Sequence, residues 1–208
     1  MHCPYCQKPV LEASVQCADC GLDLGKLDGV LGIPPVIAAG LTDPAQVLER
    51  KASRQVKRAL GKFAMRFPQV RVAVVVETAP AVVPLRTWAW WLFNRGHFSA
   101  ALDQGFMNRD FLLVVDPSRH QAALTMGYGL EPFVGTRDLA GALAAGESAL
   151  QAGEWAGACE QILVALDQAL AVIVGRMPRT YGVPLPLLLE SSAGEPASSD
   201  PGVARATW

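Results

Sequence analysis

The stretch 110–127, DFLLVVDPSRHQAALTMG, contains two runs of apolar residues separated by the four residues Pro117–His120. Branched and aromatic residues favour strands, and a proline followed by polar residues favours a turn. The stretch therefore predicts a β-hairpin, in which the segments 110–116 and 121–127 pair as antiparallel strands.

A third strand is expected upstream, at 70–78, where the sequence reads VRVAVVVET. A nearly continuous valine run fits a strand that is buried on both faces, whereas a half-exposed strand alternates apolar and polar residues. We therefore expect this segment to be a central strand of the sheet.

Apolar residues that recur every three or four positions predict four helices around these strands. We expect Thr42 or Asp43 to cap the first helix and Pro178 to end the last one. Helices that alternate with strands and then with a hairpin predict an α/β or α+β fold, with a mixed β-sheet covered by helices on both faces. The helices are expected at 42–67, 85–96, 136–152 and 154–176.

Four cysteines near the start of the chain form two Cys-x-x-Cys pairs, Cys3 with Cys6 and Cys17 with Cys20. Each pair can direct two thiolates at one ion, and the residues between the pairs can loop back to complete a tetrahedral shell of four sulfurs, as in structural zinc sites. Two disulfides or four free thiols are the alternative. The spacing thus predicts a small zinc ribbon, with zinc as its cofactor.

The composition predicts a soluble, cytoplasmic protein without a membrane span. The 208 residues carry a formal net charge of -1 and are 51% hydrophobic, which suffices for one substantial core. No apolar leader precedes the cysteines, and the apolar run at 162–175 contains Asp167 and is too short for a bilayer. Cys159, the fifth cysteine, lies in an apolar helical pattern and is expected to be a buried core residue.

These patterns divide the chain into four regions, which end in a polar tail. From Ser191 onward the sequence is rich in Ser, Ala, Gly and Pro, a composition typical of disordered chain. The expected regions are a zinc ribbon at 1–25, a connector with a short strand at 26–42, an α/β domain at 43–180 and a largely disordered tail at 181–208.

The order of the elements and four short motifs resemble the TPM domain family. The most specific motif is the turn GYGLE at 127–131. The others are the strand VVVET at 74–78, the helix end LFNRGH at 92–97 and the strand NRDFLLVV at 108–115. The similarity covers about residues 43–175 and implies a TPM-like α/β domain, here preceded by a zinc ribbon.

Members of the TPM family have been described as phosphatases and as calcium binders, and many are exported and tethered by a transmembrane helix. The resemblance therefore implies a metal-dependent phosphatase as one function. The residues themselves contain no recognised catalytic constellation, because no phosphate-cradling loop follows Cys159 and no aspartate nucleophile motif is visible. Enzymatic activity is left open at this point.

Three residues around the hairpin are candidates for a cation or ligand cleft: Asn108, Asp110 and Glu131. Paired carboxylates are ligands for a hard cation such as Ca²⁺ or Mg²⁺, and an amide oxygen can add to the shell. The alternative is an architectural turn, in which Gly127 and Gly129 let the backbone change direction sharply. These residues therefore predict a site for Ca²⁺ or Mg²⁺ in addition to the zinc site.

The first predicted helix carries seven cations and no acidic residue from Arg50 to Arg66. Arg50, Arg54, Lys57 and Arg58 can share one face opposite the apolar stripe, and such a face attracts phosphate or an acidic protein. A solvated face without a partner is the alternative. The aromatic residues that interleave with cations in a single-strand-binding groove are absent.

These observations lead to three hypotheses of function. The leading one is a cytoplasmic accessory or protein-binding protein, in which zinc folds a ribbon that presents a rigid surface to a protein partner. The second is a metal-dependent phosphatase of the TPM type, with Asp110 and Glu131 as cation ligands. The third is nucleic-acid binding through the basic helix and the zinc ribbon.

Overall fold

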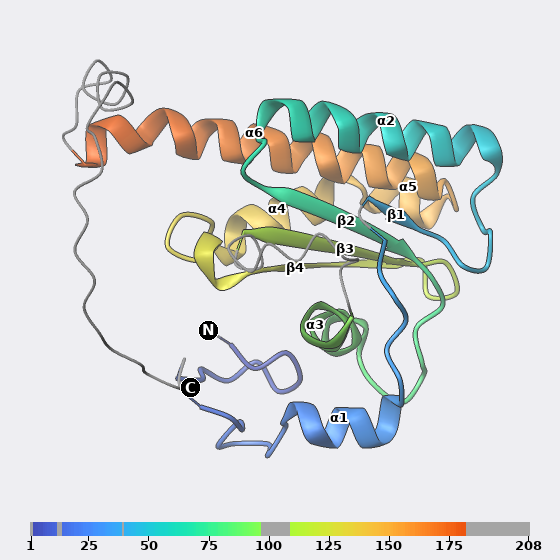
Figure 1. The fold of residues 1–208 in the computed structure, drawn as a ribbon, viewed down its shortest axis with the longest axis vertical. Coiled ribbons are helices and arrows are strands. Elements are labelled where there is room, and N and C mark those ends of the chain that lie inside the picture. Colours follow the sequence, from blue (N-terminus) through green and yellow to red (C-terminus); the bar gives the residue numbers. More distant parts are fainter. Residues whose placement is uncertain (1, 12–13, 39, 97–108, 182–208) are drawn as a thin grey trace, which may run out of the picture. The chain divides into compact units, whose positions relative to one another are not determined.

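A computed structural model describes the chain except for residues 1, 12–13, 39, 97–108 and 182–208. The chain divides into two units, Met1–Ala171 and Val172–Trp208. The first unit contains a β-sheet with helices on both of its faces (Figure 1). The polar tail from Ser191 lies outside the described residues.

The sheet has four strands and is mixed, as the hairpin predicted. β1 (Leu41–Thr42), β2 (Arg71–Val76) and β3 (Asp110–Asp116) run parallel, and β4 (Gln121–Met126) returns antiparallel to β3. The order is β1-β2-β3-β4, so β4 is an edge strand and β2 lies inside the sheet. Every residue of β3 is buried. The predicted hairpin and the predicted central strand are both confirmed.

Helices cover the sheet on both sides, which confirms the predicted layers. α3 lies on one face, and α2 and α6 lie on the other (Figure 1). A short 3-10 turn, η1 (Tyr128–Leu130), follows the hairpin. The helices of the described chain are α1 (Leu24–Leu31), α2 (Arg50–Arg66), α3 (Leu85–Arg95), α4 (Thr136–Ala145), α5 (Glu147–Gln151) and α6 (Trp155–Tyr181).

The core on the α3 side is built around two tryptophans. Alternation along the strands sends Val75 and Val114 to this face, where they join Trp88 and Trp91 in one buried cluster. The indole N–H of Trp91 donates to the Asp28 carboxylate of α1 over 2.8 Å, which satisfies its polar atom and holds α1 against α3. The tryptophan pair is therefore a packing element.

α2 begins at Arg50, eight residues later than predicted from its capping signals. Thr42 belongs to β1, and the Asp43 carboxylate accepts hydrogen bonds of 2.9 Å from the backbone N–H groups of Val47 and Leu48. Asp43 therefore closes a turn before the helix instead of capping the helix itself. The predicted connector also contains a helix, α1, that was not expected.

α6 is longer than predicted and continues through Pro178 to Tyr181. By length and composition alone, its Trp155–Arg176 portion is long and apolar enough to cross a membrane, a test that core helices of soluble proteins also pass. The helix that contains the apolar run 162–175 is therefore longer than the run itself, and the absence of a membrane span stays a prediction. Asp167 in this helix pairs with Arg66 of α2, and Ile162 is fully buried.

The segment predicted as one helix at 136–152 is interrupted at Gly146, between α4 and α5. A Cβ at Gly146 would lie 2.6 Å from Cγ1 of Ile162 and 3.0 Å from the carbonyl oxygen of Ala158, both on α6. Real Cβ atoms do not approach other atoms this closely. The α4–α5 junction therefore packs against α6 at a distance that requires glycine.

Gly146→Ala is expected to lower the free energy of unfolding by about 1–3 kcal/mol, because the added methyl overpacks against Ile162. Gly141→Ala is the matched control within α4, since a Cβ there would meet nothing within 4 Å. Alanine at this exposed helical position should add about 0.5–1 kcal/mol. Urea unfolding followed by circular dichroism measures both variants, and equal effects would contradict the close packing.

Candidate functional site

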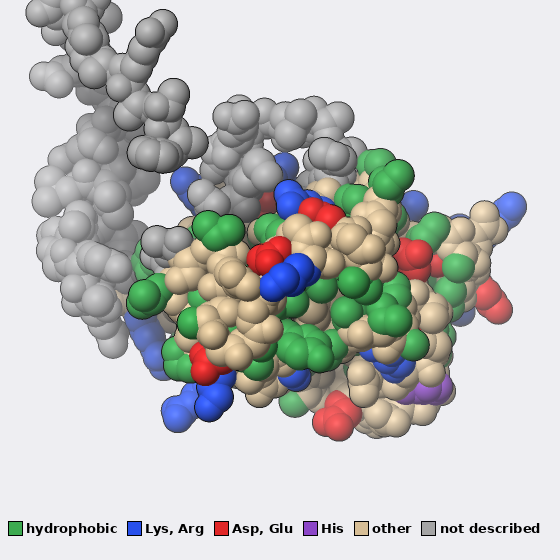
Figure 2. Space-filling model, turned by 90° about the horizontal axis from the view of Figure 1, so that it is seen from below, with side chains coloured by type: hydrophobic (Ala, Val, Ile, Leu, Met, Phe, Trp, Pro, Cys, Tyr) green, Lys and Arg blue, Asp and Glu red, His purple; other side chains and the backbone are tan. Residues whose placement is uncertain are grey.

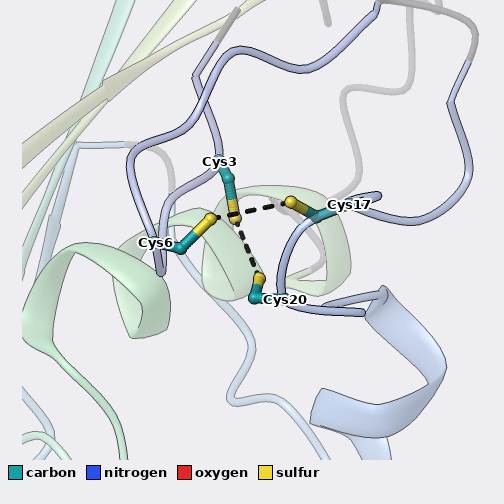
Figure 3. A group of neighbouring side chains, drawn as sticks. All are labelled: Cys3, Cys6, Cys17 and Cys20. Carbon is teal, nitrogen blue, oxygen red and sulfur yellow. Dashed lines mark hydrogen bonds between the residues drawn. The ribbon is translucent and has the colours of Figure 1, made fainter.

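The four cysteines of the two Cys-x-x-Cys pairs converge on one point (Figure 3). Their Sγ atoms all lie within 4.8 Å of one another, and the Cys3–Cys20 and Cys6–Cys17 Sγ separations are both 3.6 Å. A tetrahedral shell with Zn–S bonds of about 2.3 Å has S–S edges of about 3.8 Å, whereas a disulfide needs about 2.05 Å. The four sulfurs are therefore placed to hold a metal ion such as zinc.

Two equivalent backbone turns aim the thiols. The residue after the second cysteine of each pair, Gln7 or Gly21, has a left-handed φ of 63° or 69°. Its N–H donates to the carbonyl of the first cysteine, over 3.0 Å to Cys3 and 2.9 Å to Cys17. The sequence indicated this conformation at Gly21, where glycine favours it, but not at Gln7.

The surroundings of the site favour the thiolate form of one ligand. A hydrogen bond from the backbone N–H of Cys20 is the main cause that lowers the pKa of Cys17 to about 7. The pKa of Cys6 is raised to about 12 and that of Cys20 is also raised, so the shifts at the four thiols do not all favour the thiolate. Cys3 and Cys17 are buried, whereas Cys20 is exposed at the surface.

Cys159 takes no part in this site. It is buried within α6, and burial raises the pKa of its thiol to about 12. A nucleophilic cysteine needs a lowered pKa, so Cys159 is a small core residue, as its apolar surroundings in the sequence predicted.

Three hydrogen bonds attach the first cysteine turn to α3. Nε and Nη2 of Arg86 donate to the carbonyls of Pro4 and Tyr5, and Oγ1 of Thr87 donates to the same Pro4 carbonyl, all over 2.8 Å. Thr87 is fully buried. The cysteine module is therefore fixed to the N-terminal end of α3, next to the sheet, and no local sequence pattern indicates this contact.

A groove of about 800 Å³ lies beside this attachment. Its walls come from the first cysteine turn, α3, β4, η1 and the start of α4. The face that carries α1 and α3 shows hydrophobic side chains between scattered charges of both signs (Figure 2). Side chains that line the groove include Trp90, Phe93, Met126, Tyr128, Glu131 and Leu139.

The groove gives the GYGLE turn a place in a candidate site. Tyr128 and Glu131 of this motif both line it, together with Cys3 and Pro4 of the cysteine module. The sequence left this turn open between an architectural and a functional role. The motif therefore indicates one wall of the groove, but it does not indicate the wall formed by the cysteine module.

Of the residues predicted for a cation cleft, the two that the structure describes, Asp110 and Glu131, line different cavities. Asp110 is only 3% exposed, and its two carboxylate oxygens accept hydrogen bonds of 2.8 Å from Nε and Nη2 of Arg71. This pair joins the first residues of β2 and β3, and Asp110 lines a cavity next to α2. Glu131 lines a different cavity, the groove beside the cysteine module. Asn108 lies outside the described residues.

The predicted cations of α2 do lie together at the surface. Arg54, Lys57 and Arg58 line one shallow hollow with Lys51, and Arg50 shares the neighbouring hollow with Arg54 and Lys57. All five side chains are exposed, and the opposite side of the helix is buried against the sheet. The amphipathic pattern of the sequence was sufficient to predict this arrangement.

Comparison with known proteins adds a family to this geometry. The family described as the TPM domain matches this chain over residues 41–169, which is more than half of its length. No curated protein matches the sequence.

Three solved structures are similar to this chain. The N-terminal domain of cg2496 from Corynebacterium glutamicum is 15% identical, with 78% of this chain and 87% of that chain covered and a TM-score of 0.48. An N-terminal domain from P. gingivalis is 22% identical, with 62% and 80% covered and a TM-score of 0.47. BA42 from Bizionia argentinensis is 11% identical, with 56% and 81% covered and a TM-score of 0.44. On the family match over residues 41–169, the chain belongs to the TPM domain family.

Proposed function

We propose that this TPM-family chain is a cytoplasmic accessory protein that binds a protein partner, and that Cys3, Cys6, Cys17 and Cys20 hold a structural zinc ion. The observation that carries the proposal is the groove shared by the cysteine module, α3 and the edge strand β4. Zinc would fold a module too small to be stable through apolar burial alone. The folded module then supplies one wall of the partner site.

The groove runs along an open edge of the sheet. The N–H of Gly127 donates to the carbonyl of Asp110 over 2.9 Å, and this bond fixes the alternation of the β3–β4 ladder. The backbone groups of Ala122, Leu124 and Met126 therefore point away from β3, toward the open edge. Donors and acceptors that point outward at every second residue match the backbone of an extended polypeptide.

The sequence of β4, QAALTM, lacks the proline and the charged residues that often protect an edge strand. A second hollow of about 680 Å³ lies along Gln121–Thr125 beside α4 and α5, and it shares Arg86, Leu124 and Thr125 with the groove. The two hollows together offer room for a strand added along β4, with alternate side chains directed to either face of the sheet.

A metal-dependent phosphatase of the TPM type is a weaker candidate. It requires carboxylates that converge on a catalytic metal, and within the described chain the four cysteines form the only group of at least three His, Cys, Asp or Glu side chains placed to hold an ion. A complete four-sulfur shell leaves no open position for water or substrate. This arrangement favours a structural ion and a binding function.

We expect one zinc ion per purified chain by elemental analysis. Replacing all four cysteines of the site by serine should remove the metal and unfold the module, because the ion is its main stabilising contact. Hydrogen exchange should then become fast at Cys3–Leu22 while β2 and β3 stay protected. Cys159→Ala, outside the site, should retain the metal. A metal-free wild type, or a protected module in the four-serine variant, would contradict the zinc assignment.

Peptides selected from a random extended library against the full chain are expected to shift the amide NMR signals of Ala122, Leu124 and Met126. Leu124→Pro should weaken their binding by at least about tenfold, because proline removes an outward N–H while leaving the β3 ladder intact. Val30→Asp, on the exposed side of α1, is the control and should bind as the wild type does. Selected peptides that bind Leu124→Pro equally well would rule out pairing with β4.

A further inference from the structure

We infer that the exposed side of α2 is a second binding surface, which takes an acidic segment of a protein partner. This surface goes beyond the proposed function, because α2 and α3 lie on opposite faces of the sheet and the α2 surface needs neither the groove nor the zinc ion (Figure 1). We call it the basic face. Its cations are Arg50, Lys51, Arg54, Lys57, Arg58 and Lys62.

The basic face is continuous and open. At about 100° and 1.5 Å per residue, its six cations occupy an arc of about 140° and a length of about 18 Å along the helix axis. The uncharged residues within this arc are Gly61 and Met65. A Cβ at Gly61 would meet nothing within 4 Å, and Met65 is 79% exposed. A ligand can therefore contact the cations and one apolar side chain together.

The six cations have no acidic partners within the part of the chain that the structure describes, since none of their nitrogens lies within 4.0 Å of a carboxylate oxygen. The nearby Asp43 carboxylate is engaged by two backbone N–H groups. Arg66, at the end of the helix, pairs with Asp167 and lies outside the arc. The positive field of the basic face is therefore not neutralised by these neighbours.

The arrangement of like charges on α2 lowers the stability of the helix. Arg54 lies four residues from both Arg50 and Arg58, and Arg58 lies four residues from Lys62, so like charges face one another along the helix. Arg50 and Lys51 occupy the first turn, where the helix dipole disfavours cations. A helix face that contacts only solvent usually alternates acidic and basic residues. A bound anionic segment would reduce the repulsion between the cations of α2.

Charge complementarity favours a short acidic protein segment over nucleic acid. Six of the 18 Lys and Arg residues belong to the basic face, so 12 remain elsewhere against 19 Asp and Glu residues. A long duplex would extend past the helix onto a net-negative remainder, which repels phosphate. The basic face also has no aromatic side chain on which bases could stack. A segment of about 18 Å would cover the basic face without extending past it.

The test is fluorescence anisotropy with the full chain and a labelled 12-residue peptide of Glu and Asp with one central Leu. Arg54→Glu/Lys57→Glu should weaken binding by at least about tenfold, and raising the salt concentration should weaken wild-type binding. Arg109→Glu/Arg137→Glu makes the same change in net charge at exposed positions outside α2, and its affinity should stay within about twofold of the wild type.

Two further measurements keep the result interpretable. The α2 variant should show an unchanged or higher Tm, because it removes like-charge contacts, so lost binding cannot be attributed to unfolding. Leu124→Pro should bind the acidic peptide normally, which separates this surface from the groove. No binding by the wild type, or equal loss in both charge variants, would overturn the inference. Tighter binding of a 20-base-pair duplex, lost in the α2 variant, would overturn the choice of partner.

Discussion

Strand β3 is buried along its whole length, although an aspartate stands at each of its ends. A buried carboxylate is stable only if hydrogen bonds and a counter-charge satisfy it. Asp110 is satisfied by Arg71 at the start of β2. Asp116 accepts from the backbone N–H of Ala79 and from Ser118, and pairs with Arg119. These contacts fix both ends of β3, and with them the register of the sheet.

The same constraint gives Asp110 a partner that the residues beside the hairpin do not reveal. Asp110 has the position and chemistry of a cation ligand when the sequence is considered alone. Its partner, Arg71, is 39 residues away in the chain, and the pairing depends on the parallel register of β2 and β3. A sequence identifies a carboxylate, but it does not say which cation another strand will bring to it. The carboxylate stabilises the sheet in this fold.

Local patterns predicted most of the fold, and contacts between distant segments account for the errors. The hairpin, the valine-rich strand and the convergence of the cysteines are encoded within short stretches, so they could be predicted. The break at Gly146 depends on Ile162 of another helix. α1 does have a local signal, since the Asp23 carboxylate caps it by accepting from the N–H of Lys26. The groove joins residues about 80 positions apart, which no local pattern reveals.

The hydrogen bonds from Arg86 and Thr87 to the Pro4 carbonyl connect the four-cysteine site to the groove. Cys3 lies at the metal site and also lines the groove. A chain deprived of its ion would thus have a recognition surface with a missing wall, even with its sheet intact. Under the proposed function, occupancy of the four-cysteine site would therefore determine whether a copy of the chain can bind its partner.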